Sequence, residues 1–282
     1  MSKVKEFFTY ISDSPNIDWE GILSTQHCRY THKKCVKTRK SNPEISIGTC
    51  TVTYGKDKRD VIICPHRLLE RRQIFIDCLH LLNSHTPGNE LHIVPEVSIP
   101  GGSVDYVLVS TDKNRKVKDF VGIELQTMDT TGTVWPERQR LLQELGFHVT
   151  EDISDKTFGM NWKMTSKTIL VQLLHKIETF ESLNRHFVLI VQDHLLEYMK
   201  KEFSFSHVTD AKLGDCMHFH AYSLDNAGGA FKLHLQNRLS TDSAGISTLL
   251  GLNAKANIKF KEIATILESK ISDNTVFDFS MI

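Results

Sequence analysis

Three polar side chains that could hold a metal ion or a water molecule interrupt two neighbouring apolar runs of the sequence. Asp105 lies in the first run, and Glu124 and Gln126 lie in the second. Alternate residues of a strand share a face, so Glu124 and Gln126 should project to the same side. If the two runs form a hairpin centred between Asn114 and Arg115, Asp105 lies opposite Glu124. Two carboxylates that meet in an apolar setting raise each other's pKa unless a cation lies between them, so the pattern predicts a divalent-metal site.

Phosphodiester hydrolysis is the chemistry that such a site would serve. Magnesium takes oxygen ligands in near-octahedral geometry, and it can neutralise phosphate charge and generate or position hydroxide. Asp105 and Glu124 are predicted as direct Mg²⁺ ligands, and the main-chain carbonyl of Leu125 could be a further one. A fourth ligand could come from Glu70 or Glu96. The alternative is an ordinary hairpin with two partly exposed acids, with Glu70 and Glu96 as surface or salt-bridged residues.

The arrangement resembles the PD-(D/E)xK nucleases, in which an acidic residue after a turn is followed by acidic-x-lysine on the next strand. Gln126 stands where that lysine would lie, a variation found among restriction endonucleases. A lysine there could polarise the attacking water, whereas a neutral amide can only orient it or touch a metal-bound water. The residues before Asp105 are Gly-Ser-Val, so the first half of the pattern is only partly kept.

A second candidate site consists of four cysteines within 37 residues, separated by six, fourteen and thirteen residues: Cys28, Cys35, Cys50 and Cys64. None of these gaps is the two-residue spacing common in zinc knuckles. In a reducing cytosol structural disulfides are not expected, and four clustered thiols favour a tetrahedral site for zinc or iron. Such a metal would fold a lobe too small to be held by its own core. The alternative is four independent buried thiols.

Other residues that could take part in chemistry receive structural interpretations. His27, His32 and His66 flank the cysteines and are expected to be structural or phosphate-facing. Cys78 and Cys216 lie among apolar residues and are expected to be inert core residues.

The charge distribution predicts a polyanion-binding surface, although the chain has 34 basic and 34 acidic residues. Between His27 and Arg72, twelve Lys and Arg residues face four Asp and Glu, a local excess of eight positive charges. A basic lobe on a neutral chain fits nucleic acid, the alternative being scattered solvated lysines. Candidate phosphate contacts are Lys33, Lys34, Lys37, Arg39 and Lys40. Arg138 and Arg140 are hypothetical base or phosphate contacts, and a solvated helix face is the preferred interpretation for them.

The order of the expected elements predicts an α/β fold in the broad sense, with helices packed on a mixed sheet. Helices are expected at 66–83, 136–146, 163–180, 195–203 and 258–271, and strands at 47–54, 60–64, 91–99, 104–110, 119–127, 187–192 and 218–224. Residues 1–26 are expected to form a short helix and turn. No apolar run reaches the roughly 18 residues of a membrane span, and the N-terminal segment lacks a secretory core, so a cytosolic protein is expected.

Together the two sites resemble the NotI-type restriction endonucleases, most clearly over residues 25–135. The resemblance is carried by residues 48–50, 62–69, 104–108 and 122–126. It implies a restriction-endonuclease-like mixed sheet flanked by helices, with a helix and four-cysteine lobe over 1–64 and a nuclease core with a C-terminal extension over 65–282. It also implies a Mg²⁺-dependent, homodimeric type II enzyme that cuts double-stranded DNA within a GC-rich palindrome.

Carried over by position, the resemblance makes Asp105, Glu124 and Gln126 catalytic. It assigns the structural metal, iron in that family, to Cys28, Cys35, Cys50 and Cys64. Two other functions stay open. One is a structure-specific repair nuclease of the same fold, and the other is a metal-stabilised DNA-binding protein without catalysis.

Overall fold

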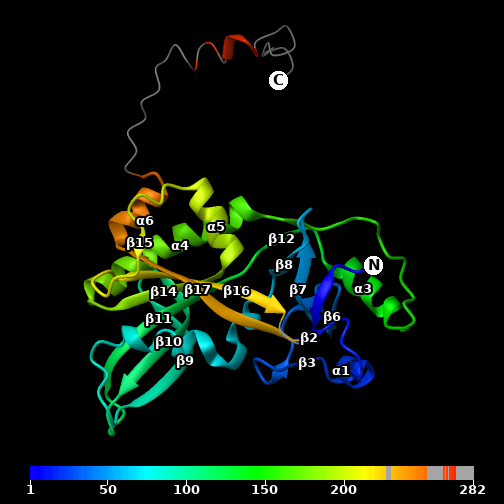
Figure 1. Ribbon diagram of the computed structural model, residues 1–282, viewed down its shortest axis with the longest axis horizontal. Coiled ribbons are helices and arrows are strands. Elements are labelled where there is room, and N and C mark those ends of the chain that lie inside the picture. The colour runs from blue at the N-terminus through cyan, green and yellow to red at the C-terminus, as the bar shows by residue number, and fades with distance from the viewer. Residues whose placement is uncertain (227–229, 253–262, 264, 266, 271–282) are drawn as a thin grey trace, which may run out of the picture. The chain divides into compact units, whose positions relative to one another are not determined.

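The computed structural model describes residues 1–226, 230–252, 263, 265 and 267–270 (Figure 1). Residues Met1–Gly251 form one compact unit. The helix expected at 258–271 falls mostly on residues outside the described set. In the part of the chain that the structure describes, no helix combines the length and the apolar character needed to cross a membrane.

Within the described residues, the largest sheet has seven strands in the order β15-β17-β16-β14-β11-β10-β9. In chain order they are β9 (Glu90–Ile99), β10 (Gly102–Thr111), β11 (Val117–Gln126), β14 (His186–Gln192), β15 (Thr209–Asp210), β16 (Met217–Asn226) and β17 (Phe231–Thr241). The strands expected between residues 91 and 127, at 187–192 and at 218–224 are confirmed, whereas β15 and β17 add two that the sequence reading omits. The prediction of a mixed sheet is confirmed, because β14 runs parallel to β11 and β16 while the outer neighbours are antiparallel.

Two helices make the crossovers between the parallel strands. Helix α4 (Trp162–Ser182) lies between β11 and β14 in the chain, and α5 (Asp193–Glu202) lies between β14 and β16. Together with α6 (Ser243–Leu249) they cover one face of the sheet (Figure 1). Every residue of β14 is buried, because its alternate side chains pack against these helices and against the segments on the other face.

The other face is covered by short helical segments, so the prediction of one helix over 66–83 is wrong. The chain forms η1 (Pro65–Arg72), α2 (Gln73–Ile76) and η2 (Leu79–Leu81). The first segment breaks at Glu70, with ψ at 123°, and at Arg71, with φ at 50°. Burial of Arg67 explains the break, because its guanidinium must meet the carboxylates of both Glu6 and Glu70.

The N-terminal residues form small sheets. One has the order β2-β1-β7-β8, and two-stranded pairs are made by β3 with β4 and by β5 with β6. Their bounds are β1 (Val4–Phe7), β2 (Tyr10–Ile11), β3 (His27–Cys28), β4 (Lys33–Lys34), β5 (Thr38–Arg39), β6 (Asn42–Ser46), β7 (Thr49–Tyr54) and β8 (Arg59–Ile62). Helix α1 (Trp19–Thr25) is present, but β1 and β2 replace part of the expected helix and turn. β7 and β8 confirm the strands expected at 47–54 and 60–64.

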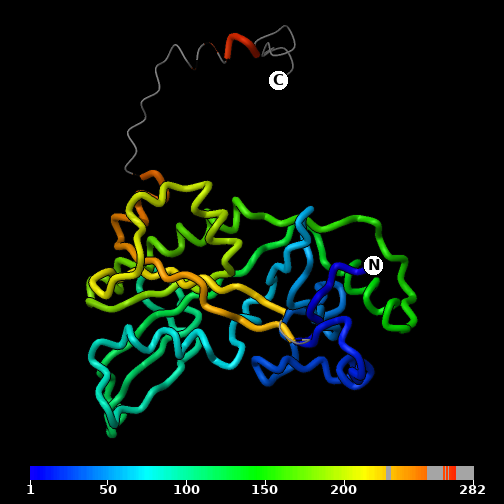
Figure 2. Tube along the Cα trace, in the orientation of Figure 1, coloured from blue at the N-terminus to red at the C-terminus, as the bar shows by residue number. Residues whose placement is uncertain are grey.

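The N-terminal sheets are attached to the central sheet at several points. The backbone N–H of Met128, just after β11, donates to the carbonyl of Ile62 in β8 at 3.2 Å. At the end of β14, the side chain of Gln192 accepts from the Ile62 N–H and donates to the Asp60 carbonyl, at 2.9 and 2.8 Å. Figure 2 shows the N-terminal segment beside α3 (Trp135–Glu144), where Ser2 donates to the Glu137 carbonyl. The domain boundary at residue 64 stays a prediction.

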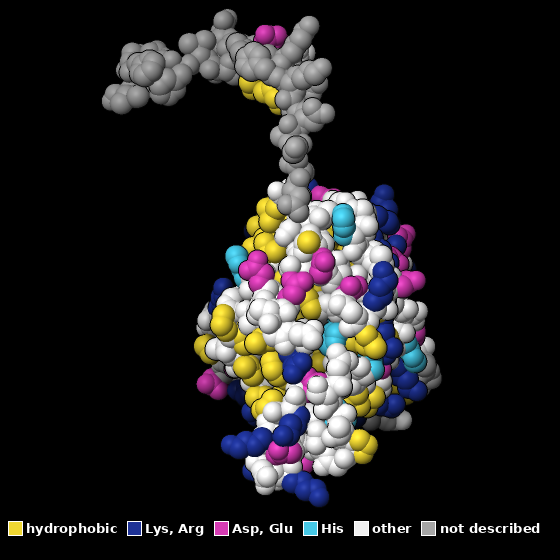
Figure 3. Space-filling model, turned by 90° about the vertical axis from the view of Figure 1, so that its left-hand side faces the viewer, with side chains coloured by type: hydrophobic (Ala, Val, Ile, Leu, Met, Phe, Trp, Pro, Cys, Tyr) yellow, Lys and Arg dark blue, Asp and Glu magenta, His cyan; other side chains and the backbone are white. Residues whose placement is uncertain are grey.

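The side of the molecule turned toward the viewer in Figure 3 mixes hydrophobic, acidic and basic side chains. Lys and Arg side chains gather at its lower end, where the turn between β10 and β11 lies. That turn and its flanks carry Lys113, Arg115, Lys116 and Lys118. Basic charge is therefore not confined to the lobe between His27 and Arg72.

Candidate active site and cysteine cluster

The β10–β11 hairpin has the register that the sequence predicts. Its ladder pairs Tyr106 with Ile123, so Asp105 and Glu124 are the next residues along the two strands. The carboxylate of Asp105 accepts a hydrogen bond from the backbone N–H of Leu125 at 2.8 Å. This bond holds Asp105 against the strand beside Glu124, and the structure thereby brings the two predicted acids together.

Glu124 lies in a buried and highly polar environment. Its side chain is 9% exposed, and Lys176 Nζ donates to Oε1 at 2.6 Å. Burial raises the pKa of Glu124, the nearby charge of Asp105 raises it further, and the bond and charge of Lys176 oppose both. The second oxygen, Oε2, is buried and has no hydrogen-bond partner among the described residues. A buried anionic oxygen without a partner, beside a second carboxylate, fits an oxygen-seeking divalent cation.

Lys176 is the residue of this site that sequence reasoning missed. It comes from α4, more than fifty positions after Glu124. The signal was a charge within an apolar stripe, since buried Ile169, Leu173 and Ile177 share its helix face. A lysine at such a position is rarely buried unless it is paired, and here the partner is Glu124.

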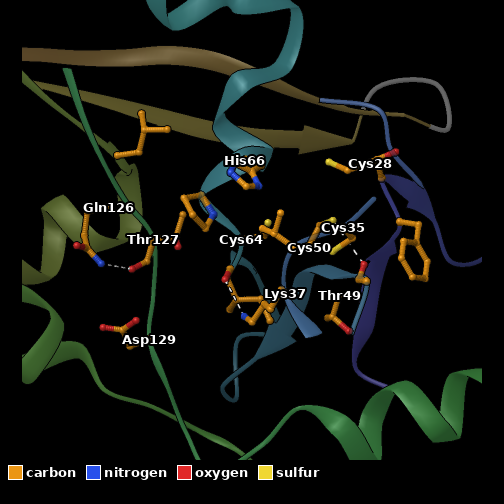
Figure 4. Close-up of a pocket in the computed structure, with 17 residues that line it drawn as sticks. Cys28, Cys35, Lys37, Thr49, Cys50, Cys64, His66, Gln126, Thr127 and Asp129 are labelled. Atoms are coloured by element: carbon orange, nitrogen blue, oxygen red, sulfur yellow. Dashed lines mark hydrogen bonds between the residues drawn. The ribbon is translucent and has the colours of Figure 1, made fainter. Parts of the chain in front are cut away.

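Gln126 lies two residues beyond Glu124, at the end of β11. Its amide donates to the Thr127 carbonyl at 2.6 Å, and its side chain lines a cavity of about 350 Å³. Figure 4 shows Gln126 at one end of that cavity and the four cysteines toward the other. The predicted catalytic amide and the predicted metal thiols therefore border the same space.

Of the two acids suggested as a fourth ligand, Glu70 is fully engaged elsewhere. Its carboxylate accepts from Arg67 Nη1 at 3.1 Å and from the Leu233 N–H at 2.9 Å. Arg67 also bonds Glu6, so Glu70 belongs to a buried ion-pair network. These contacts give Glu70 a structural role.

Glu96 has the better position. The β9–β10 ladder pairs Val97 with Val104 and Pro95 with Tyr106, so Glu96 falls opposite Asp105 where the ladder is interrupted. Glu96 is exposed and has a left-handed φ of 51°. A non-glycine residue in that region is uncommon, and here it occurs without any shift in the β9–β10 register.

All four predicted cysteine ligands line the cavity of Figure 4. Cys28, Cys50 and Cys64 are buried, Cys35 is half-buried, and within the described residues none forms a disulfide. In the same part of the chain, no three His, Cys, Asp or Glu side chains converge closely enough to form a ready metal site. Four sulfur donors around one cavity nevertheless have the donor chemistry that zinc or iron requires.

Two of the four thiols, those of Cys50 and Cys64, affect each other directly. Contact with Cys50 lowers the pKa of Cys64, and the same contact raises the pKa of Cys50. The bond to Cys64 also raises the pKa of His66, to which the charge of Asp105 contributes. His66 therefore lies within electrostatic reach of both the cysteine cluster and the carboxylate pair.

The predicted phosphate contacts differ in their freedom to meet DNA. Lys33 and Lys40 are exposed. Lys34 pairs with Glu44 at 3.5 Å, and the Nζ of Lys37 donates to the carbonyl of Ile63 at 3.2 Å. The remaining candidate, Arg39, stacks over the ring of Trp135 at 4.3 Å and pairs with Glu151.

The solvated helix face preferred for Arg138 and Arg140 is wrong for Arg138, which is buried, while Arg140 is partly exposed and paired. Contact with DNA stays a prediction for both. Arg138 is 5% exposed, donates to the Ile47 carbonyl at 3.1 Å and lies over Trp135. Burial lowers its pKa to about 10. Arg140 pairs with Glu137 at 2.8 Å and donates to the Ser154 carbonyl at 2.7 Å.

The other residues singled out from the sequence are two histidines beside the cysteines and two further cysteines. His27 and His32 are exposed, with ring centroids 6.4 Å apart. Cys78 is buried, and burial raises its pKa above the ordinary range of a thiol. Burial also raises the pKa of Cys216 to about 12. Cys78 is therefore a core residue as expected, whereas Cys216 is only half-buried.

Comparison with known proteins identifies the family. No curated protein sequence matches the chain. A family model described as restriction endonuclease NotI matches residues 24–233, which is most of the chain. The matched span contains the four cysteines, the carboxylate hairpin and Lys176. Membership implies nuclease activity on DNA, and the chain belongs to the NotI restriction endonuclease family.

Proposed function

We propose that the protein is a type II restriction endonuclease that cuts double-stranded DNA at a specific palindrome by Mg²⁺-dependent hydrolysis. The observation that carries the proposal is the pairing of half-buried Asp105 with buried Glu124, in which Glu124 Oε2 lacks a hydrogen-bond partner among the described residues. A protein that only bound DNA would gain nothing from this arrangement, since an unpaired buried anion costs stability.

In this proposal Asp105 and Glu124 hold the magnesium ion, with the carbonyl of Leu125 as a further oxygen. The bound ion would neutralise phosphate charge and favour a water molecule's ionisation. Gln126 would orient the attacking water through its amide. Glu96, opposite Asp105 in the β9–β10 register, would add a carboxylate at the edge of the site.

The four cysteines would hold a structural iron or zinc ion. Burial raises the pKa of Cys35, and backbone hydrogen bonds from Lys37 and Gly48 oppose this only in part, so a metal ion would have to supply the charge that favours the thiolate. The metal would stabilise the loops between β3 and β8, where the strands are short and few residues are buried.

The same lobe would bind the DNA backbone through exposed basic residues such as Lys33 and Lys40. A twofold dimer would present one such surface to each half of a palindrome. The family resemblance supports a homodimer, a GC-rich site and a cytosolic enzyme.

Digestion of unmethylated viral genomic DNA tests the proposal. Purified protein with Mg²⁺ should give discrete fragments whose sequenced ends share one palindrome, and Asp105→Ala should give none. Diffuse or structure-dependent nicking that still needs Asp105 would instead indicate a repair-type nuclease. Absence of cutting with Mg²⁺, Mn²⁺ or Co²⁺, with DNA binding retained in Asp105→Ala, would indicate a binding protein.

A further inference from the structure

The acidic pair has no lysine two residues after Glu124, and a lysine from another element reaches it. Gln126 is neutral, so β11 supplies no positive charge two residues after Glu124. Lys176 of α4 supplies an ammonium group at 2.6 Å from Glu124 Oε1. The two side chains are 7% and 9% exposed, so the pair is shielded from water and its Coulomb interaction is little screened.

The backbone around Lys176 is built to keep this side chain in place. Gly101, in the turn before β10, has φ at 93°, and a Cβ atom there would lie 2.0 Å from the His175 carbonyl oxygen. A Cβ at Gly102 would lie 3.3 Å from Lys176 Cε. Thr179 then donates to the Pro100 carbonyl at 2.9 Å. The two glycines thus let α4 approach the turn closely enough for its lysine to reach Glu124.

Lys176 changes the net charge of the two central carboxylates and their cation, a sum that leaves out the exposed Glu96 at the edge of the site. Asp105 and Glu124 carry two negative charges when ionised, and Lys176 reduces the total to one. A divalent cation would then leave one positive charge, which matches the single negative charge of a phosphodiester. Without the lysine, the metal-loaded site would be neutral and would lose its electrostatic attraction for the scissile phosphate.

We propose that Lys176 supplies from helix α4 the positive charge that a strand lysine supplies in acidic-x-lysine sites, and that it does so through its bond to Glu124 Oε1, which leaves Oε2 free. Its contact is with Glu124 and not with the reacting atoms, so it is a positioning residue. This inference rests on the proposed function and adds Lys176 to the residues of the proposed nuclease site.

The test compares Lys176→Met with Lys167→Met, an exposed lysine of the same helix. Lys176→Met should lower the cleavage rate by about 100-fold, which is typical for loss of one electrostatic contact in an active site. It should bind Mn²⁺, measured by electron paramagnetic resonance without DNA, as tightly as the wild type or more tightly, since a positive charge near the cation is removed. Lys167→Met should match the wild type in both measurements.

A second variant separates the role of the charge from a role in folding. In the double variant Gln126→Lys/Lys176→Met, the ammonium group returns on the strand face that carries Glu124. The cleavage rate should be at least about tenfold higher than that of Lys176→Met. This corresponds to about 1.4 kcal/mol of restored transition-state stabilisation. Recovery would show that the site needs the charge, whichever element provides it.

Three results would overturn the inference. They are unimpaired cleavage by Lys176→Met, loss of Mn²⁺ binding together with cleavage, and a double variant as inactive as Lys176→Met. The second result would mean that the lysine only supports the fold. A wild-type protein that cuts no DNA with any divalent metal would instead refute the proposed function, and this inference with it.

Discussion

The carboxylate of Glu124 is costly to bury without a partner for each oxygen, and for the same reason it is suited to binding a cation. One of its oxygens is bonded to Lys176, and the other is buried without a described partner. An unpaired anionic oxygen destabilises the metal-free protein, and a cation would remove that cost. We therefore expect divalent metal to stabilise the fold as well as to support cleavage.

The first prediction concerns Glu124→Gln. The substitution keeps the shape of the side chain and its acceptor for Lys176 but removes the charge that would bind the cation. Cleavage should fall by about 100-fold or more, while specific DNA binding in Ca²⁺ or without metal persists. Cleavage and gel-shift assays on the same DNA measure the two effects. Cleavage at the wild-type rate would refute the site.

The pH dependence of cleavage follows from the same carboxylate. Burial and the charge of Asp105 raise the pKa of Glu124 above its ordinary value of 4.5. Since the ionised form would bind the metal, cleavage should be lost as the pH falls through this raised pKa. The acidic limb of the rate profile at low Mg²⁺ should therefore lie above 4.5, and high Mg²⁺ should move it downward by competing with the proton. A limb at or below 4.5, unmoved by Mg²⁺, would contradict this assignment.

At the scale of elements, the close approach of α4 to the turn before β10 places Lys176 at the candidate active site. Gly101 is the tightest point, because an added Cβ would lie 2.0 Å from a backbone oxygen of the helix. Gly146, after α3, has a similar φ of 87° but nothing within 4 Å of the same Cβ position. Substitution of Gly146 would therefore cost only backbone strain, whereas substitution of Gly101 would add a clash with the backbone of α4.

Substitution of these glycines gives a matched pair of variants. Gly146→Ala should cost about 1–2 kcal/mol of unfolding free energy, from the left-handed φ alone. Gly101→Ala should cost about 3 kcal/mol or more, because the helix must also move away. It should also lower cleavage by displacing Lys176. Urea unfolding and cleavage assays measure both, and equal stabilities of the two variants would contradict the packing described for α4.

Two buried histidines of strand β16, His218 and His220, should make the stability of the fold sensitive to acid. Burial lowers the pKa of His218 to about 4 and that of His220 to about 3, from an ordinary value of 6.5. Below pH 6.5 these two histidines are protonated in the unfolded chain but stay neutral in the folded one. The free energy of unfolding therefore falls as the pH drops from 6.5 toward 4. Each histidine should remove about 1.4 kcal/mol per pH unit in that window.

A variant of β16 tests this origin of the acid sensitivity. His220→Leu should give a shallower loss of stability below pH 6.5, measured by thermal unfolding at a series of pH values. His234→Leu, on the neighbouring strand and half exposed, is the control and should keep the wild-type slope. Equal slopes for both variants would mean that other groups cause the loss.

At the scale of the whole molecule, one cavity links the four N-terminal cysteines with the candidate active site. The cavity lined by the four thiols extends to Gln126. Cys50→Ser should therefore lower the metal content of purified protein and its melting temperature, while Cys216→Ser, away from the cavity, should leave the metal content unchanged. Atomic emission spectroscopy and thermal unfolding check both. Wild-type protein without bound metal would contradict the proposed site.

The parts of this fold that could be predicted from the sequence are those set by local pattern. The hairpin register followed from the two apolar runs around Asn114 and Arg115, and it placed Asp105 beside Glu124. Burial that depends on distant partners could not be predicted in this way. Arg67 is buried because Glu6 meets it from the first strand, and Lys176 is buried because Glu124 does. The prediction of a single helix over 66–83 is wrong because of the first of these contacts, between Arg67 and Glu6.

The bonds between β8 and the ends of β11 and β14 have a mechanical consequence. Gln192 and Met128 tie β8 to the ends of β14 and β11, so a swing of the N-terminal sheets as a separate clamp would break these bonds. A stiff protein surface that contacts backbone phosphates makes the nucleic acid the partner that must bend. Base pairs that touch no side chain would then influence the choice of site through the energy needed to deform them.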